Sequence, residues 1–407
     1  MQANKLYFKN SKGIQLSGHL DLPADQKPHN FVLFAHCFTC NKNFNAVRNV
    51  SRALTLRGFG VFQIDFTGLG ASKGDFADSN FSGNVADLVA AAHFLEEAYQ
   101  SPTLVIGHSL GGAAAIVAAS QLDSVRAVAT IGAPASPQHV AHLFQANLQE
   151  INQTGEALVN IGGRPFTIKK QFLDDLSEQT FPQMLRHLRK SLLVLHSPQD
   201  TVVGIENASM LFTQAHHPKS FVSLDGADHL LNREEDSLYA GDVIASWARR
   251  YLPARPVPEL HSVHEVVALL QQDAAYTTTI KAGDHYLTAD EPVAVQGKNF
   301  GPTPYQLVAS GLAACSAMTV KMYAARKGWP LEDIEVHITY KKDHADDSIH
   351  EEDQSAKIDI FEREIKMTGP LDETQLQRLL EIADKCPVHK TLHSEVLVRT
   401  KLMKGQV

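Results

Sequence analysis

Hydrophobic residues in the first 250 positions alternate between two kinds of segment. Short and nearly unbroken apolar runs lie at residues 31–35, 60–66, 103–107, 126–132, 192–196 and 220–224. Between most of them are longer stretches with apolar residues at helical spacing, such as "NAVRNVSRALTLRG" (45–58). Buried strands that alternate with helices predict a parallel β-sheet covered on both faces. We expect an α/β fold here, preceded by a β-hairpin around "NSKG" (10–13).

Two intervals depart from this alternation. Residues 134–190 contain helix-like segments but no clear strand, so we expect a helical cap insert. A helical pattern then ends near Leu252, and "PARPVPEL" (253–260) follows with three prolines and no apolar periodicity. Such a stretch is typical of a linker. We therefore predict domains at residues 1–253 and 261–407, joined by a linker at 254–260.

The last 150 residues have a different order of elements. A strand pair at about 274–290 precedes a long helix at 305–328. The pattern then predicts two strands, a helix and a final strand, at residues 333–342, 356–367, 372–386 and 394–402. Strands grouped around two helices indicate an α+β domain.

Composition narrows the class of protein. The chain has 407 residues, of which 44% are hydrophobic and 20% charged, and a net charge of −8. This size favours two domains, and an acidic balance without a basic block argues against nucleic acid or an anionic membrane as partner. The first twenty residues have no apolar signal region, and four cysteines make no disulfide framework. We expect a cytoplasmic protein with no metal and no cofactor.

The clearest chemical motif is "GHSLGG" (107–112). It follows the apolar run "TLVI" and begins the small-residue stretch "LGGAAAIVAAS". Gly-x-Ser-x-Gly at a strand-to-helix turn is the nucleophile elbow, in which a strained serine projects above the sheet. The helix N-terminus places N–H groups near a developing oxyanion. The pattern also arises by chance, but its strand–turn–helix context favours Ser109 as a nucleophile.

A nucleophilic serine needs a general base and an acid that orients the base. Asp200 follows the strand pattern at 192–196, and His229 follows the one at 220–224. Both positions are carboxyl ends of strands, where the sites of parallel sheets collect. Asp225 and Asp228 are alternatives, but aspartates next to a histidine in a loop are more often turn residues. We predict a Ser109–His229–Asp200 triad.

With these motifs in place, residues 1 to about 253 resemble an α/β-hydrolase of the compact esterase or peptidase-like type. The resemblance implies an oxyanion hole formed by the N–H of Leu110 and by an N–H of the loop after an early strand, usually written His-Gly-x. Here that loop reads "HCFTC" (36–40), so Phe38 would carry the second N–H and Cys37 stands in the place of glycine. Esters or thioesters are favoured over peptides as the small-molecule substrate.

The same "HCFTC" is open to other interpretations. Cys37-x-x-Cys40 between a strand and a helix also suits a thioredoxin-like redox pair. A zinc site would need further close-spaced Cys or His ligands, and the sequence has no second such pair. The complete Ser, Asp and His set downstream favours the oxyanion-loop role.

The C-terminal domain holds the other two cysteines. Cys315 lies in the long helix, within "GLAACSAMTV", and Cys386 lies in "ADKCPVHKTL". Pro387 is suited to begin a new helical turn with the thiol at its start. Two buried, inert thiols are an equally acceptable interpretation of the residues alone.

"GPTPYQLVASGLAACSAMT" with "KCPVHKTL" resembles the OsmC/Ohr family of osmotically inducible and organic hydroperoxide resistance proteins, over roughly residues 270–405. The resemblance implies a peroxiredoxin-like reaction in which Cys315 attacks an organic hydroperoxide and becomes a sulfenic acid. Cys386 then closes a disulfide that an external dithiol reduces. It also implies a homodimer through this domain.

The chain departs from the peroxidases of that family at two positions. They carry an arginine on an early strand and a glutamate about ten residues before the first cysteine, whereas this chain has no arginine between Arg255 and Arg326 and has Tyr305 at the second position. Lys281 and Glu291 are candidate substitutes. Two functions stay open: a bifunctional hydrolase and peroxidase, or a hydrolase whose C-terminal domain dimerises or binds a ligand.

Overall fold

The computed structural model describes most of the chain, at residues 2–24, 26–37, 42, 44–161, 164–178, 181–254, 259–272, 274–344 and 357–403. The chain forms two compact units, of which the first is Met1–Leu269 with Thr279–Thr288 and the second Leu270–Thr278 with Ala289–Val407. The linker proposed at 254–260 stays a prediction, because residues 255–258 lie outside the described residues.

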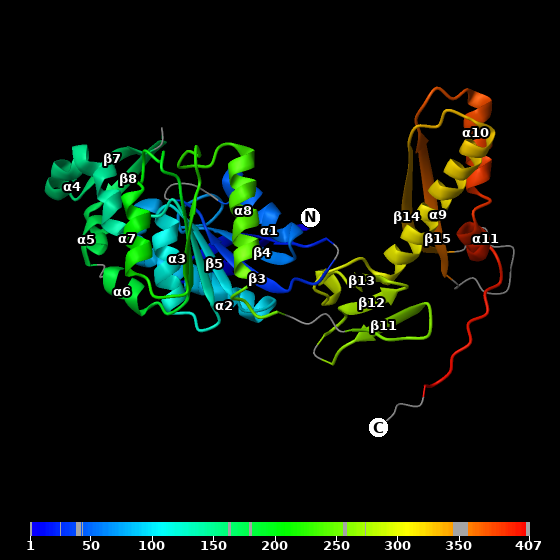
Figure 1. The fold of residues 1–407 in the computed structure, drawn as a ribbon, viewed down its shortest axis with the longest axis horizontal. Coiled ribbons are helices and arrows are strands. Elements are labelled where there is room, and N and C mark those ends of the chain that lie inside the picture. Colours follow the sequence, from blue (N-terminus) through cyan, green and yellow to red (C-terminus); the bar gives the residue numbers. More distant parts are fainter. Residues whose placement is uncertain are drawn as a thin grey trace. The chain divides into compact units, whose positions relative to one another are not determined.

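An eight-stranded sheet with the order β1-β2-β4-β3-β5-β6-β9-β10 forms the centre of the first unit (Figure 1). Its strands are β1 (Gln2–Lys9), β2 (Gln15–Leu22), β3 (Asn30–Ala35), β4 (Phe59–Asp65), β5 (Leu104–His108), β6 (Ala127–Ile131), β9 (Ser191–His196) and β10 (Lys219–Ser223). From β4 to β10 all neighbours are parallel, whereas β1 and β2 form an antiparallel hairpin. The predicted parallel sheet and hairpin are therefore confirmed.

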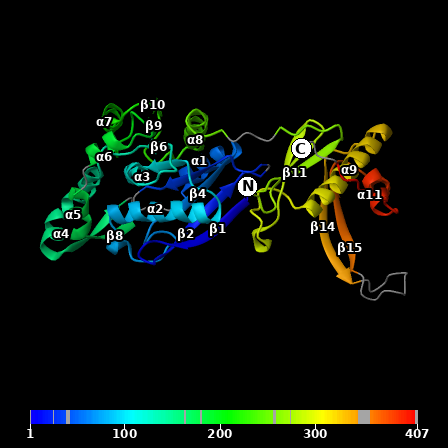
Figure 2. The same cartoon turned by 90° about the horizontal axis from the view of Figure 1, so that it is seen from below.

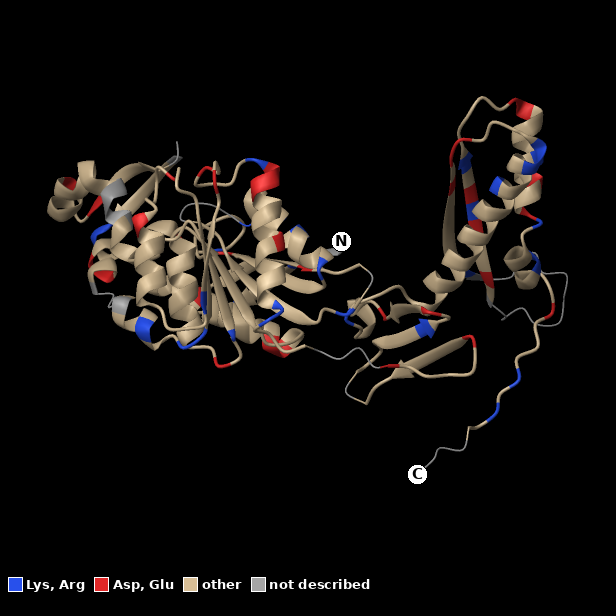
Figure 3. Cartoon of the chain, in the orientation of Figure 1, with Lys and Arg blue, Asp and Glu red and all other residues tan. Residues whose placement is uncertain are grey.

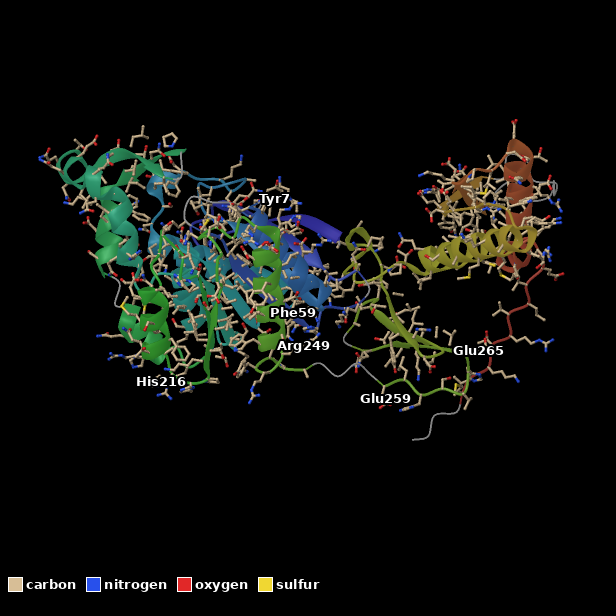
Figure 4. The ribbon with its side chains drawn as sticks, turned by 45° about the horizontal axis from the view of Figure 1, so that its top comes forward. Tyr7, Phe59, His216, Arg249, Glu259 and Glu265 are labelled. Atoms are coloured by element: carbon tan, nitrogen blue, oxygen red, sulfur yellow. The ribbon has the colours of Figure 1, made fainter. Side chains whose placement is uncertain are left out.

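Helices cover both faces of this sheet (Figures 1 and 2). On one face lie α1 (Asn45–Leu56) and α8 (Glu234–Ala248), and on the other α2 (Phe81–Ala98) and α3 (Leu110–Ser120). Buried side chains of α1 and α8 pack with Phe59 and other strand residues in one apolar cluster. Figure 4 labels Phe59 and Arg249, the latter just beyond α8. Such a core holds the strand ends, and the loops on them, in fixed positions.

The cap insert is not wholly helical. It contains η2 (Pro137–Asn147), α4 (Leu148–Thr154), α5 (Lys170–Glu178) and α6 (Phe181–His187), but also an antiparallel hairpin of β7 (Glu156–Ile161) and β8 (Arg164–Lys169). The expectation of no strand there was wrong. In β7 buried Ala157 and Val159 alternate with exposed neighbours, and this short period-two pattern was the missed signal. The first unit also holds η1 (Phe76–Asp78) and α7 (Glu206–Gln214).

From β12 to α10 the C-terminal elements follow the predicted order. A three-stranded sheet consists of β11 (Val266–Leu270), β12 (Thr278–Ala282) and β13 (His285–Ala289), followed by η3 (Val293–Val295) and α9 (Pro304–Lys327). The antiparallel pair β14 (Ile334–His344) and β15 (Lys357–Met367) precedes α10 (Glu373–Ala383) and α11 (Pro387–Leu392). Thr303 and Gln306 form a capping box at the start of α9, and Gly328 ends it at φ +65°.

Strands β14 and β15 carry charged residues of both signs (Figure 3), and by their register the cross-strand pairs lie on the face away from the helices. Cross-strand pairs there include Lys341 with Glu362 and Lys366 with Glu335. The opposite face packs against α9 and α10 in a small apolar cluster that includes Val320, Leu379 and Ile382. This alternation fixes which residues of β15 point toward the helices.

Part of the C-terminal unit is apolar and exposed in a single chain. In α9, Met318 is 65% and Met322 73% exposed. Among the described residues one helix, α9, is long enough and apolar enough to cross a membrane. The core helices of soluble proteins pass the same test of length and composition. The strand predicted at 394–402 is not formed, because a strand needs a hydrogen-bonded neighbour and this exposed segment has none in the described chain.

Candidate functional sites

Ser109 lies in the turn between β5 and α3, with a backbone φ of 56°. This left-handed conformation is costly for a side chain with a Cβ and is held here by its surroundings. A Cβ at Gly107 would lie 2.2 Å from the carbonyl oxygen of Gly111, and a Cβ at Gly111 would lie 2.3 Å from that of His36. Only glycine permits this close approach of helix and strands, which holds Ser109 at the end of the sheet.

A chain of hydrogen bonds joins the three predicted triad residues. His229 Nε2 lies 3.0 Å from Ser109 Oγ, and His229 Nδ1 lies 2.7 Å from Asp200 Oδ2. A carboxylate only accepts hydrogen bonds, so Nδ1–H donates to Asp200 and the neutral ring accepts the Ser109 hydroxyl at Nε2. This is the arrangement in which an imidazole can take the proton of the serine.

Asp200 is held as a carboxylate. Its side chain is 1% exposed, and its Oδ1 accepts the N–H groups of Val202 and Val203 at 2.8 and 2.9 Å. Burial by itself raises the pKa of Asp200, but its hydrogen bonds and the charge interaction with His229 outweigh this and lower the pKa below its ordinary value. Gly132, at φ +54°, lies against the Asp200–His229 pair, where a Cβ would be 3.3 Å from each.

The alternative acids do not contact His229. Asp228 accepts hydrogen bonds from the backbone and side chain of Asn232, and Asp225 accepts one from Ser223. Both act as turn residues, as loop aspartates commonly do. His196 is buried beside Asp200, with Nε2 3.7 Å from Oδ2, and donates to the carbonyl of Val203.

One of the two predicted oxyanion-hole donors, Leu110, lies within the described residues. Leu110 is the first residue of α3, where backbone N–H groups have no intrahelical acceptor. Phe38, the predicted second donor, lies outside the described residues, as does Cys40. Cys37 is buried, has no positive φ and is disulfide-bonded, so it occupies the place of glycine without the strain that a left-handed turn would impose.

A buried ion pair fastens the segment that follows this loop. Lys42 Nζ pairs with Asp65 Oδ2 at the end of β4 and donates to Ser17 Oγ at 3.0 Å. Asp65 also accepts the N–H groups of Lys42 and Ala71, both at 2.9 Å. The side chains are 6% and 1% exposed. Sequence patterns did not reveal this pair, because a lysine in a polar loop is usually solvated.

Two histidines beside the elbow are buried. His108 Nε2 lies 2.7 Å from the backbone oxygen of His229, and burial, followed by the charge of His229, lowers the pKa of His108 to about 3. His36 Nδ1 lies 2.8 Å from the carbonyl oxygen of Cys37, and burial lowers its pKa as well. His36 also lines a cavity of about 10 Å³ with Phe66 and Asn84, near the minimum that one water molecule needs. Both histidines are neutral at physiological pH.

The two free cysteines are close together in the second unit. Cys386 is the N-cap residue of α11, as the sequence predicts, and its sulfur accepts the His389 N–H at 3.3 Å. Its thiol also interacts with that of Cys315 and lies 3.6 Å from Ser316 Oγ. Cys386 is fully buried, whereas Cys315 is partly exposed.

The candidate substitutes for the family's arginine and glutamate make other contacts. Lys281 Nζ donates to the carbonyl of Leu260, and the Tyr305 ring stacks on Tyr340 with centroids 4.4 Å apart. Glu291 accepts through its backbone oxygen from Asn299. The cation that faces the thiols is instead Arg363 of β15, which donates to Ser316 Oγ at 2.7 Å. No local pattern marked Arg363, because strand pairing and helix packing bring it to the site.

Comparisons with known proteins match the N-terminal and C-terminal parts of the chain to two different families. Residues 26–157 match the family described as serine aminopeptidase, S33, and residues 296–401 match the OsmC-like protein family. The esterase domain of a Rhodothermus marinus protein is 51% identical over 62% of this chain and 99% of that chain, with a TM-score of 0.53.

More distant solved structures share the fold. Est1E from Butyrivibrio proteoclasticus, solved with ferulic acid bound, is 19% identical over 60% of this chain and 98% of its own, with a TM-score of 0.51. Alpha/beta hydrolase domain-containing protein 10 from mouse is 19% identical over 61% and 99%, with a TM-score of 0.51. Among curated protein sequences, none matches the chain.

Replacing Lys42 by Met removes the ammonium and leaves the Asp65 carboxylate buried without its counter-ion. We expect the free energy of unfolding of the first unit to fall by about 3–5 kcal/mol. Urea unfolding followed through the fluorescence of Trp247 in α8 measures it. Lys73→Met, at an exposed lysine of the neighbouring loop, is the matched control. Equal stability of the two variants would contradict a stabilising role for the ion pair.

Acid should destabilise the first unit through His108. The unfolded histidine binds a proton near pH 6.5, whereas the folded one does so only near pH 3. As the pH falls from 6.5 toward 3, the unfolding free energy should therefore fall, by up to about 1.4 kcal/mol per pH unit. His108→Gln, which keeps a donor for the His229 carbonyl, should flatten this slope in denaturant titrations, and His93→Gln on the surface should not. A slope unchanged in His108→Gln would refute this origin.

Proposed function

This chain belongs to the α/β-hydrolase family as a serine ester hydrolase with an OsmC-like domain at its C-terminal end, and we propose that it cleaves a carboxylic ester or thioester through Ser109, His229 and Asp200. The observation that carries the proposal is the unbroken hydrogen-bond chain from Ser109 Oγ through the His229 ring to the buried Asp200 carboxylate. Peptides are less favoured, since the described residues form no propeller domain that would select an extended chain.

In the proposed reaction, Ser109 Oγ attacks the ester carbonyl while His229 Nε2 takes its proton. Asp200 holds the ring in the required tautomer and stabilises the imidazolium. The developing oxyanion accepts a hydrogen bond from the N–H of Leu110, and the family resemblance assigns a second one to Phe38. His229 then gives its proton to the leaving alcohol or thiol. Water next attacks the acyl carbonyl while His229 takes its proton, the bond to Ser109 Oγ breaks, and His229 returns the proton to Ser109.

For the C-terminal domain we propose that Cys315 and Cys386 reduce organic hydroperoxides, with an external dithiol restoring both thiols. Support comes from the proximity of the two free thiols and from donors around Cys386 that favour a thiolate. We further propose a homodimer through this domain. Its support is the apolar surface left exposed on α9 and in the segment after α11, where Val398 is 81% exposed.

The hydrolase proposal is tested by a fluorophosphonate probe with a panel of small esters and thioesters. The probe should label Ser109, and Ser109→Ala should lower kcat by roughly 10⁴-fold or more while the fold is kept. Ser120→Ala, at the exposed end of the same helix, should keep both labelling and turnover. Undiminished ester cleavage in Ser109→Ala would refute the assignment of the nucleophile.

The peroxidase proposal is tested by mass spectrometry of the reduced protein after substoichiometric cumene hydroperoxide. We expect a Cys315–Cys386 disulfide and one equivalent of the alcohol. Cys315→Ser should abolish the disulfide. If both thiols stay free in excess peroxide, the domain is a dimerisation or ligand-binding module, and sedimentation of the full chain then decides whether it dimerises.

A further inference from the structure

Cys386 is surrounded by hydrogen-bond donors in a site that excludes solvent. The sulfur accepts the backbone N–H of His389, interacts with the Cys315 thiol and lies 3.6 Å from Ser316 Oγ. Ser316 is itself fully buried, in α9 next to Cys315. A thiolate has no proton to donate and gains from each donor, whereas a thiol gains little from them.

Arg363 controls which way the Ser316 hydroxyl points. Its Nη1 donates to Ser316 Oγ at 2.7 Å and to the carbonyl of Ala383 at 3.2 Å, and its Nη2 pairs with Asp384. Since Arg363 occupies an acceptor site of Ser316, the hydroxyl proton must go to the Leu312 carbonyl at 2.8 Å or to the Cys386 sulfur. A thiolate is the stronger acceptor of the two.

The position of Arg363 follows from the period-two alternation of β15. It shares the helix-facing side of the strand with Ile365, which packs against the cluster formed by α9 and α10. Its side chain is only 11% exposed. The electrostatic interaction of a cation with nearby polar and charged groups is stronger when the cation is mostly removed from water.

Other ionisable groups around Cys386 do not cancel this effect. Burial by itself raises the pKa of Cys386, but the His389 N–H, Ser316, Cys315 and the charge of Arg363 outweigh it, so the pKa is lowered. Burial, followed by the charges of His393 and Arg363, lowers the pKa of His389, which is therefore neutral at physiological pH. Asp384 is an exposed partner of the guanidinium and holds it in place.

We propose that Ser316, positioned by Arg363, makes Cys386 the resolving and leaving thiolate of the pair, while the more accessible Cys315 meets both the peroxide and the external dithiol. This inference rests on the proposed thiol chemistry of the domain. The family resemblance leads one to expect a cation that activates Cys315, whereas Arg363 contacts Ser316, which lies beside the Cys386 sulfur. Arg363 thus stabilises the thiolate of Cys386, and it affects the formation and the reduction of the disulfide rather than the attack on the peroxide.

The Cys315 thiolate attacks the peroxide, the O–O bond breaks, and the alkoxide takes a proton to leave as the alcohol. The Cys386 thiolate attacks the sulfenic sulfur of Cys315, the S–O bond breaks, and hydroxide leaves as water after taking a proton. One thiolate of the dithiol then attacks Cys315, Cys386 leaves as a thiolate held by Ser316 and the His389 N–H, and the second thiol of the dithiol frees Cys315.

Which sulfur the reductant attacks is decided by access and by the leaving group. Cys386 is fully buried and Cys315 is partly exposed. In thiol–disulfide exchange the thiol with the lower pKa leaves faster. Both factors favour attack on Cys315 with departure of Cys386.

The test uses the full chain in two experiments. In a Cys315→Ser background, alkylation of Cys386 by iodoacetamide is followed against pH by peptide mass spectrometry. Arg363→Gln and Ser316→Ala should each raise the midpoint by roughly one pH unit. Arg378→Gln, at an arginine of α10 paired with Glu381, should leave it unchanged. A purely structural role of Arg363 would alter the amount of folded protein without moving this midpoint.

The second experiment keeps both cysteines and forms their disulfide with diamide, which requires no peroxidase activity. Dithiothreitol should reduce this disulfide roughly threefold or more slowly in Arg363→Gln than in Arg378→Gln, since the leaving thiolate has lost its stabilisation. The reduction potential of Arg363→Gln should also be more negative. If Arg363→Gln fails to fold, Ser316→Ala carries the comparison, because Arg363 keeps its contacts to Ala383 and Asp384.

The outcomes separate this inference from the peroxidase proposal. Equal midpoints and equal reduction rates in the Arg363, Ser316 and Arg378 variants overturn the inference, as does a dimedone-trapped sulfenic acid that forms on Cys386 faster than on Cys315. If the expected differences appear with diamide but peroxide forms no disulfide, the role of Arg363 and Ser316 in thiol exchange stands and the peroxidase proposal fails.

Discussion

The close approach of helix α3 to the ends of strands β3 and β5 is the constraint on which the ester site depends. Gly107 and Gly111 lie so near neighbouring carbonyl groups that any side chain would collide with them. This contact holds Ser109 at a positive φ, directs its hydroxyl toward His229 and presents the first N–H groups of the helix. The packed sheet beneath supplies the rigidity that keeps such a strained residue in place.

The loop opposite the elbow shows how a departure from the family pattern is accommodated. Cys37 replaces a glycine, yet it adopts no positive φ and its side chain is buried in a disulfide. The Ser109–His229–Asp200 hydrogen bonds are present together with this disulfide. Lys42, a few residues further, is fastened to Asp65 at the end of β4. Lys42 is therefore held to the end of the sheet by charge.

The thiol site applies the same physics to sulfur. In both units the proposed nucleophile lies where donors or a base are already in place, and buried charge is paired with a specific partner. Asp200 orients His229 by accepting its N–H, and Arg363 orients Ser316 by donating to its oxygen. The two arrangements differ in origin, since the first comes from loops at strand ends and the second from a strand side chain under two helices.

Periodicity and short motifs determined much of this protein. The parallel sheet, the long helix with its capping box, the order of C-terminal elements and the positions of Ser109, Asp200 and His229 at strand ends follow from local pattern, because burial and turn chemistry act over a few residues. Tertiary structure decided the rest. The Lys42–Asp65 pair and the contact of Arg363 with Ser316 join residues far apart in the chain. No local pattern encodes such contacts, because they depend on how strands pair and how helices pack on them.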